Sequence, residues 1–294
     1  MCDLLCALPS ATRGATLFAK NSDRPPSEEQ LIEWLPPRLD PTSTLATHVE
    51  VPAHPEPTLG IVGCRPVWGW GLEHGVNEAG LAAGNATIYT TLDPRDAPDA
   101  LTGMDLVRLT LERCREADAA VSMLAELLAT AGQGGPGHDG GRRPYWSSFL
   151  FADPRRAFVV ETSGNSGAVE EVADVRAISN CTTIPSFSAE HAHPGQPVES
   201  LVLPRLDASR RALERRPVTV EALQAHLRSH EGGENGWTVC MHVDDPDHEE
   251  ATTSSMVAEL PLDGPPIVHV LLGSPCQGTY RPVAVGPGTW LDGG

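Results

Sequence analysis

The stretch CDLLCALPSATRGATLFAK, residues 2–20, decides the fold. Two mostly apolar runs, residues 2–8 and 15–19, flank PSATRG at 9–14, whose composition is typical of a turn. Apolar runs separated by such a segment predict two antiparallel strands joined by a loop. The chain is therefore expected to begin with a β-hairpin.

The register of this hairpin determines which side chains lie near the start of the chain. A loop centred between residues 11 and 12 would place Cys2 opposite Asn21, because antiparallel partners lie at equal distances from the centre of their loop. Lys20 and Asp23 then lie beside the first residues. The hairpin thus predicts a cluster of a thiol, an ammonium and a carboxylate.

Outward from this hairpin, the chain alternates between strand and helix patterns. The proline-rich stretches 24–29 and 36–57 predict loops with one edge strand between them. The remaining expected elements are two helices in 103–131 with a break at 115–117, a hairpin in 148–162, helical structure in 205–230, and strands at 237–243, 254–260 and 267–272. This order predicts an α+β fold in which two mainly antiparallel sheets pack together and helices cover them.

Composition excludes several classes of function. The 294 residues carry a formal net charge of −18, which would repel nucleic-acid phosphates and anionic lipid. No signal peptide or run of about 20 apolar residues is recognisable. We therefore expect a cytoplasmic protein with one domain, residues 2–294, that does not bind nucleic acid or membranes. It could form a homo-oligomer.

The cysteines predict thiols rather than disulfides, since seven is an odd number and their spacing fits no disulfide or zinc pattern. Cys240, His242 and Asp244 would share one strand face, and His248 lies close in sequence. This group matches no standard ligand spacing, so a solvated acidic loop is the favoured interpretation. No metal and no cofactor are predicted. The glycine-rich segment 132–144 lacks the ending of a phosphate-binding loop and predicts a linker or a lid.

A catalytic role is predicted for Cys2. If Met1 is removed, Cys2 carries both a thiol nucleophile and a free α-amine, whose ordinary pKa of about 7.7–8.0 suits a general base. Lys20 is the single lysine among 21 basic residues; its ammonium would favour the thiolate. The Asp23 carboxylate could orient the amine. An oxyanion intermediate also needs donors, which asparagine amides could supply.

Several segments together resemble the secernin and bacterial dipeptidase family of N-terminal-nucleophile (Ntn) hydrolases. They are Cys2-Asp3, FAKNSDR at 18–24, RPVWGWGLEHGVNEAGLAAGN at 65–85, GMDLVRLTLER at 103–113, GQGG at 132–135, SSFLFADPRRAFVVETSG at 147–164, ISN at 178–180 and TTSSM at 252–256. The resemblance implies a four-layer αββα sandwich and cleavage of amide bonds in dipeptides or related small amides. It spans almost the whole chain.

The resemblance also implies roles for individual residues. Cys2 falls at the nucleophile and Asp23 at the position that holds the amine. Lys20 stands where the wider superfamily has an arginine, Asn85 matches an oxyanion-binding asparagine, and Asn180 matches an asparagine that contacts the amine. Relatives carry a further active-site arginine just after the TTSSM segment, whereas Val257 and Ala258 follow it here. No arginine is carried over at that place.

Three hypotheses for the function remain open. The first is a cofactor-independent cysteine amidohydrolase, most simply a dipeptidase, whose substrate pocket is lined by loops 24–40, 65–75 and 185–205. The second is an acyltransferase or amide-forming enzyme, in which an amine intercepts the acyl-enzyme. The third is a non-catalytic scaffold, for which Cys2 would be only a buried strand residue and Asn85 a turn residue. The matching contexts of the five site residues argue against the third, but they serve the first two equally.

Overall fold

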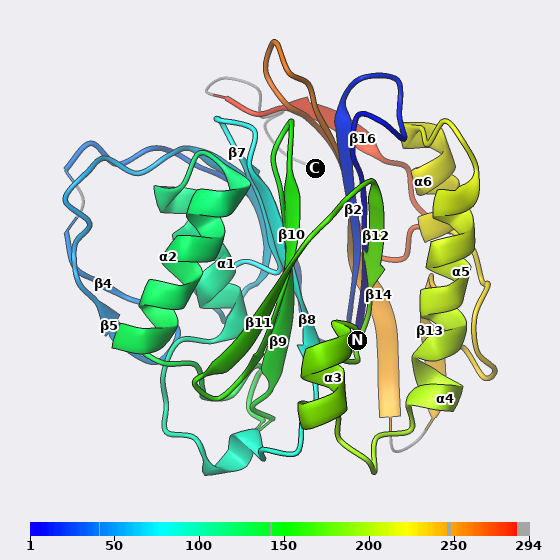
Figure 1. Ribbon diagram of the computed structural model, residues 1–294, viewed down its shortest axis with the longest axis horizontal. Helices are drawn as coiled ribbons and strands as arrows, with labels where there is room; N and C mark the ends of the chain where they lie inside the picture. Colours follow the sequence, from blue (N-terminus) through cyan, green and yellow to red (C-terminus); the bar gives the residue numbers. More distant parts are fainter. Residues whose placement is uncertain (41, 142, 246–247, 287–294) are drawn as a thin grey trace.

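The computed structural model describes residues 1–40, 42–141, 143–245 and 248–286. Within them, two antiparallel seven-stranded sheets pack face to face, and helices lie on the outer face of each sheet (Figure 1). The four layers therefore follow the order helix, sheet, sheet, helix. This confirms the predicted α+β sandwich.

The first sheet contains the N-terminal hairpin. Its strand order is β12-β1-β2-β14-β15-β16, and β13 pairs with β14. The strands are β1 (Cys2–Ala7), β2 (Thr16–Arg24), β12 (Val175–Ile178), β13 (His242–Asp245), β14 (His248–Leu260), β15 (Ile267–Leu272) and β16 (Arg281–Ala284). The outer face of this sheet is covered by helices α4 (Val198–Leu201), α5 (Leu203–Glu214) and α6 (Val220–Leu227).

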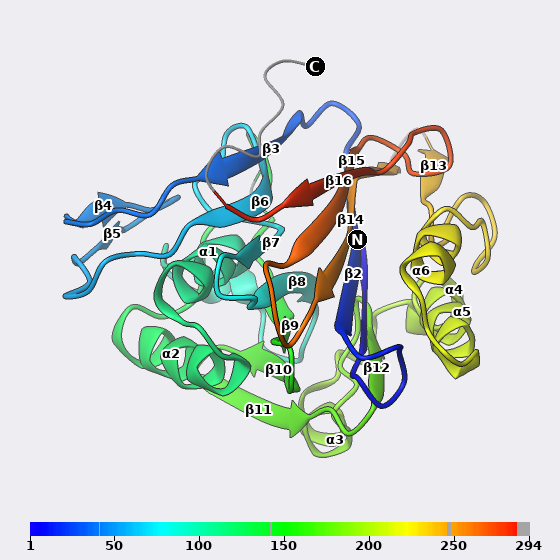
Figure 2. The same cartoon turned by 90° about the horizontal axis from the view of Figure 1, so that it is seen from above.

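The second sheet has the order β11-β10-β9-β8-β7-β6-β3. Its strands are β3 (Gln30–Leu35), β6 (Ile61–Pro66), β7 (His74–Asn77), β8 (Ala82–Ile88), β9 (Trp146–Ala152), β10 (Ala157–Ser163) and β11 (Ser166–Glu171). Helices α1 (Gly103–Arg113) and α2 (Ala117–Thr130) cover its outer face, as Figure 2 shows from above. The remaining elements are the short pair β4 (Thr44–Leu45) and β5 (Glu50–Val51), the 3-10 turn η1 (Pro94–Asp96), and α3 (Pro185–His191).

Strand β1 is buried along its whole length because both of its faces are covered, and Asp3 is its one charged residue. Leu4 and Cys6 belong to the core between the two sheets, whereas Leu5 and Ala7 belong to the core beneath the helices of the first sheet. Successive side chains of a strand point to opposite faces, so one buried strand serves two cores. The hairpin consequently lies between two hydrophobic cores and contributes side chains to both.

The register of the hairpin differs from the prediction by one residue. Cys2 pairs with Ser22, not with Asn21, and Leu4 pairs with Lys20. A slip of one residue moves a strand's side chains to the other face. In the observed register Lys20 therefore shares the inner face with Cys2, and Asp23 lies on the face that meets the helices.

Helical structure is present in 205–230 as predicted, whereas the strand expected at 237–243 was wrong in its bounds. Residues 205–230 form two helices, α5 and α6, separated by 215–219, where Pro217 cannot continue a helix. Of the strand expected at 237–243, only the end is extended, because β13 begins at His242. The edge strand predicted between the two proline-rich stretches is present as β3.

In the described part of the chain, no helix combines the length and apolarity needed to cross a membrane.

Candidate active site

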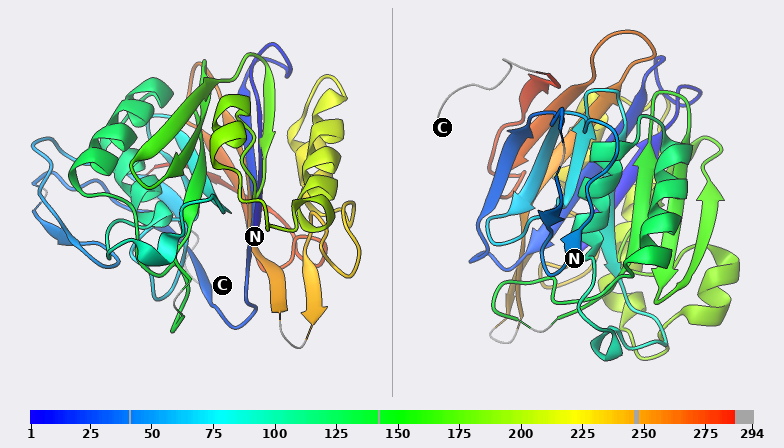
Figure 3. Two further views of the ribbon diagram at one scale, coloured as in Figure 1. Left: turned by 60° about the horizontal axis from the view of Figure 1, so that its bottom comes forward. Right: turned by 90° about the vertical axis from the view of Figure 1, so that its left-hand side faces the viewer.

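The N-terminus lies between the two halves of the molecule, as Figures 1 and 3 show. Cys2 is 6% exposed and packs into the core between the sheets. Its backbone N–H donates to Oδ1 of Asn180 over 2.8 Å, so the strand's first residue is tied to the segment that follows β12. Two of the predicted site residues are thereby brought into direct contact.

Lys20 lies fully buried beside Cys2. Its Nζ donates to the backbone oxygen of Glu73 over 2.8 Å and to Oε2 of the same residue over 3.1 Å, and the Cys2 thiol is close enough to affect its pKa. Burial by itself would lower the pKa of Lys20, but the thiol and Glu73 outweigh it and raise that pKa. Burial raises the pKa of Cys2, and the Lys20 ammonium opposes this rise.

Glu73, which the sequence analysis did not single out, holds this ammonium. Its carboxylate also accepts from Nη1 of Arg24 over 2.5 Å and from the Ser22 hydroxyl over 3.1 Å. Burial would raise the pKa of Glu73, but Lys20 and Arg24 outweigh that effect and keep it well below its usual range. In the sequence, the feature that could have identified Glu73 as a site residue is its position within the motif at 65–85.

Asp23 contacts the start of the chain through its backbone. The Met1 amine donates to the Asp23 carbonyl, and the Asp23 N–H donates to the Met1 carbonyl, both over 2.8 Å. The side chain turns the other way, where Oδ1 accepts from Thr252 over 2.6 Å. Oδ2 is buried without a hydrogen-bond partner, 3.9 Å from Nη1 of Arg205. Burial raises the pKa of Asp23 to about 7, against the opposing charges of the amine and Arg205.

Arg205, fully buried on α5, is a second residue that the sequence analysis missed. Its Nη1 donates to Oδ2 of Asp3 over 2.6 Å, and its Nη2 donates over 3.0 Å to the same Asn180 oxygen that accepts from Cys2. The sequence signal is a cation on the buried stripe of a helix, among Leu206, Ala208, Ser209 and Leu213. A guanidinium thus enters the site from α5, although none follows the TTSSM segment.

Asn85 reaches this region from β8 of the second sheet. Its Nδ2 donates to the Ser147 hydroxyl over 3.4 Å, while its Oδ1 is buried without a hydrogen-bond partner. Burial raises the pKa of Tyr145, and Glu73 and Cys2 add to the rise. Asn85 lies close enough to Tyr145 to oppose this rise and lower the pKa of its hydroxyl. Tyr145 therefore lies near both Asn85 and the Cys2 thiol.

A cavity of about 540 Å³ reaches the site through Gln196, although none of the five predicted site residues lines it. Its wall includes Tyr89, Arg95, Arg143, His193 and Gln196, and Nε2 of Gln196 donates to the Asn180 carbonyl over 2.7 Å. Of the three loops expected to line a pocket, 185–205 contributes to this wall; the described residues of 24–40 and 65–75 do not. Loop 24–40 instead borders a smaller hollow with Thr252 and Thr253.

No model of a protein family matches the chain. Among solved structures, the C2A mutant of conjugated bile acid hydrolase from Clostridium perfringens is similar over 96% of each chain, with 13% identity and a TM-score of 0.59. An arginine-to-leucine variant of the same hydrolase gives 14% identity over 98% of this chain and 99% of that one, with a TM-score of 0.58. At this identity the likeness shows a shared fold.

Proposed function

We propose that this chain is a cysteine amidohydrolase that uses Cys2 as its N-terminal nucleophile once the residue before it has been removed. One observation carries the proposal: Cys2 and the buried Lys20 ammonium share the inner face of the hairpin, close enough for their charges to interact, while the backbone nitrogen of Cys2 is held by Asn180. A nearby cation favours the thiolate, which is the nucleophilic form of cysteine. Fold similarity to a hydrolase supports the same chemistry.

The reaction would proceed in two steps. The thiol sulfur attacks the amide carbonyl carbon, and the α-amine of Cys2 accepts the thiol proton and returns it to the leaving amine. The C–N bond breaks and a thioester to Cys2 forms. Water then attacks the thioester with the α-amine again taking a proton, so that the carboxylic acid leaves and the thiol is restored.

Neighbouring groups would orient the amine. Asn180 Oδ1 accepts from the backbone N–H of Cys2, which becomes the amine once Met1 is removed, and Arg205 fixes the Asn180 amide by donating to the same oxygen. The unpartnered Oδ2 of Asp23 offers a further acceptor near the start of the chain. Holding the amine by its N–H groups leaves its lone pair for the thiol proton.

Asn85 is proposed to stabilise the oxyanion. Its amide has one end without a hydrogen-bond partner, and a half-turn about the last side-chain torsion exchanges the oxygen for the NH₂ group. A preorganised donor of this kind contributes about 2.7–4 kcal/mol to the transition state.

The proposed substrate is a small amide with a carboxylate, most simply a dipeptide. The cavity wall carries Arg95, Arg143 and His193, together with the anionic Asp93. Guanidinium groups pair well with carboxylates. Arg95 is already paired with Asp93 over 2.5 Å, so Arg143 is the cation of this wall proposed to bind the substrate carboxylate.

The proposal is tested with purified protein, a panel of dipeptides and small amides, and mass spectrometry. We expect an N-terminus that begins at Cys2, a transient acyl adduct on that residue, and hydrolysis of at least one substrate class. Cys2→Ala should lower turnover by more than about 10⁴-fold, since loss of a nucleophile removes the covalent route.

Cys6→Ala is the matched control. Cys6 lies on the same strand and face, and burial raises its pKa to about 12, so its thiol is inert. This variant should retain turnover. Active protein that still carries Met1, or Cys2→Ala with full activity, would refute the proposal.

A further inference from the structure

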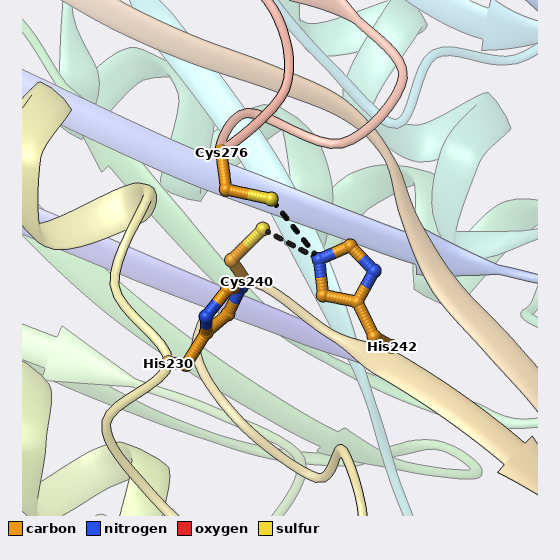
Figure 4. Close-up of side chains that lie close together, drawn as sticks. All are labelled: His230, Cys240, His242 and Cys276. Carbon is orange, nitrogen blue, oxygen red and sulfur yellow. Dashed lines mark hydrogen bonds between the residues drawn. The ribbon is translucent and has the colours of Figure 1, made fainter.

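Four side chains gather at the edge of the first sheet, away from Cys2. They are His230, Cys240, His242 and Cys276, and one nitrogen or sulfur from each lies within 4.8 Å of the others. Figure 4 shows both sulfurs directed at the ring of His242, with His230 beside Cys240. The cluster shares two residues with the group considered from sequence, but takes His230 and Cys276 in place of Asp244; the side chain of His248 lies outside the described residues.

The spacing of these atoms suits a tetrahedral metal ion. The Cys240 and Cys276 sulfurs lie 3.3 and 3.2 Å from Nε2 of His242. In a tetrahedral zinc site, Zn–S bonds of about 2.3 Å and Zn–N bonds of about 2.0–2.1 Å separate neighbouring sulfur and nitrogen ligands by about 3.6 Å. A small outward movement of each side chain would admit the ion.

Hydrogen bonding alone does not account for this arrangement. An imidazole nitrogen carries either one proton or one lone pair, so Nε2 of His242 can make one good hydrogen bond. Two sulfurs nevertheless approach it. A cation among the four ligand atoms would satisfy both thiolates and both imidazoles together.

The backbone already holds the three contributing segments in place. The Cys240 N–H donates to the Ser229 carbonyl over 2.9 Å, which joins it to the residue before His230. Nη1 of Arg228 donates to the carbonyls of Pro275 and Gly278, each over 2.8 Å, and so fixes the loop that carries Cys276. Little ordering would be needed for binding.

We propose that His230, Cys240, His242 and Cys276 bind one Zn²⁺ ion as a structural site. Two thiolates and two imidazoles in a tetrahedral arrangement select zinc over the harder cations. Four protein ligands leave no open position for substrate, which is the arrangement of structural rather than catalytic zinc.

The zinc site would also stabilise the candidate active site. Met241 lies between two of the ligands, and its N–H donates to the Thr252 hydroxyl over 2.9 Å. Thr252 in turn donates to Oδ1 of Asp23 over 2.6 Å. The metal would therefore hold Met241 in place, and through it the Thr252 hydroxyl on β14 that binds the Asp23 carboxylate.

The test measures metal directly and needs no enzymatic activity. Protein without an affinity tag is purified under reducing conditions, and its zinc content is determined by elemental mass spectrometry. We expect about one zinc per chain. After removal by a chelator, added Co²⁺ should give the visible absorption of a tetrahedral site together with thiolate charge-transfer bands.

Variants separate the site from adventitious binding. Cys276→Ser and Cys240→Ser should each lower zinc affinity by at least about 100-fold, since loss of a ligand costs no less than loss of an outer-shell partner. Cys114→Ser is the control, because Cys114 caps α1 in the other half of the molecule, and it should retain the metal. Reduced protein that binds neither Zn²⁺ nor Co²⁺, or variants that bind both as the parent does, would overturn the proposal.

Discussion

Lys20 is a buried cation with two neighbours, the Glu73 carboxylate and the Cys2 thiol. Replacing it with methionine should remove the charge that favours the thiolate. We expect Lys20→Met to raise the pKa of Cys2 by about one to three units, the usual effect of one close opposite charge. The rate of Cys2 alkylation by iodoacetamide, followed against pH, measures this shift.

Lys20→Arg is the matched control, since it keeps the charge. It should react faster than Lys20→Met at every pH below the thiol pKa. Lys20→Met should also destabilise the fold, but by less than the roughly 3–5 kcal/mol of a fully broken buried pair, because Arg24 still neutralises Glu73. Equal alkylation profiles for the two variants would show that the charge at this position does not act on Cys2.

The N-terminus of α1 packs directly on the strands that carry Asn85 and Ser147. A Cβ added at Gly103 would lie 2.2 Å from the Ser147 hydroxyl and 2.5 Å from Nδ2 of Asn85. Gly103→Ala should therefore displace the Asn85 amide. We expect kcat to fall by about 10²–10³, as for the loss of one oxyanion donor, with alkylation of Cys2 unchanged because that reaction forms no oxyanion.

Gly141→Ala controls for the substitution itself, since the nearest atom to its added Cβ is 3.6 Å away. Asn85→Ala should reproduce the kinetic loss of Gly103→Ala. If Gly103→Ala slowed alkylation as much as turnover, the helix end would be acting on the nucleophile, and the role proposed for Asn85 would be wrong.

The elements themselves were largely predictable, and the register of the hairpin was not. The turn and the two apolar runs of the opening stretch suffice to predict two paired strands. Both faces of β1 are buried and apolar except for Asp3, however, so no solvated polar face indicates which residues of β2 oppose it. The observed pairing of Cys2 with Ser22 is therefore a property that the local pattern leaves undetermined.

Partners far apart in the sequence were missed for a related reason. Arg205 meets Asp3 across 202 residues, and Glu73 meets Lys20 across 53. Local periodicity places each residue on a helix or strand, but the packing of whole layers determines which charges meet. Cys276 likewise joins Cys240 and His242 only when the loop after β15 folds back beside β13. Cys2, Lys20 and Asp23 were predictable together because one hairpin contains all three.

The free energy of unfolding of the whole molecule should depend on pH through the Asp23 carboxyl. Burial raises the pKa of this carboxyl from 3.8 to about 7, so its contribution to stability is full below pH 4 and is lost as the pH rises to about 7. At about 1.36 kcal/mol per pKa unit, the loss approaches 4 kcal/mol. Asp23→Asn, which cannot titrate, should therefore lose less stability than the parent between pH 4 and 7 in urea unfolding. Because other carboxylates titrate in both proteins, the difference between the two isolates Asp23, and parallel curves would show that its pKa is not raised in the folded state.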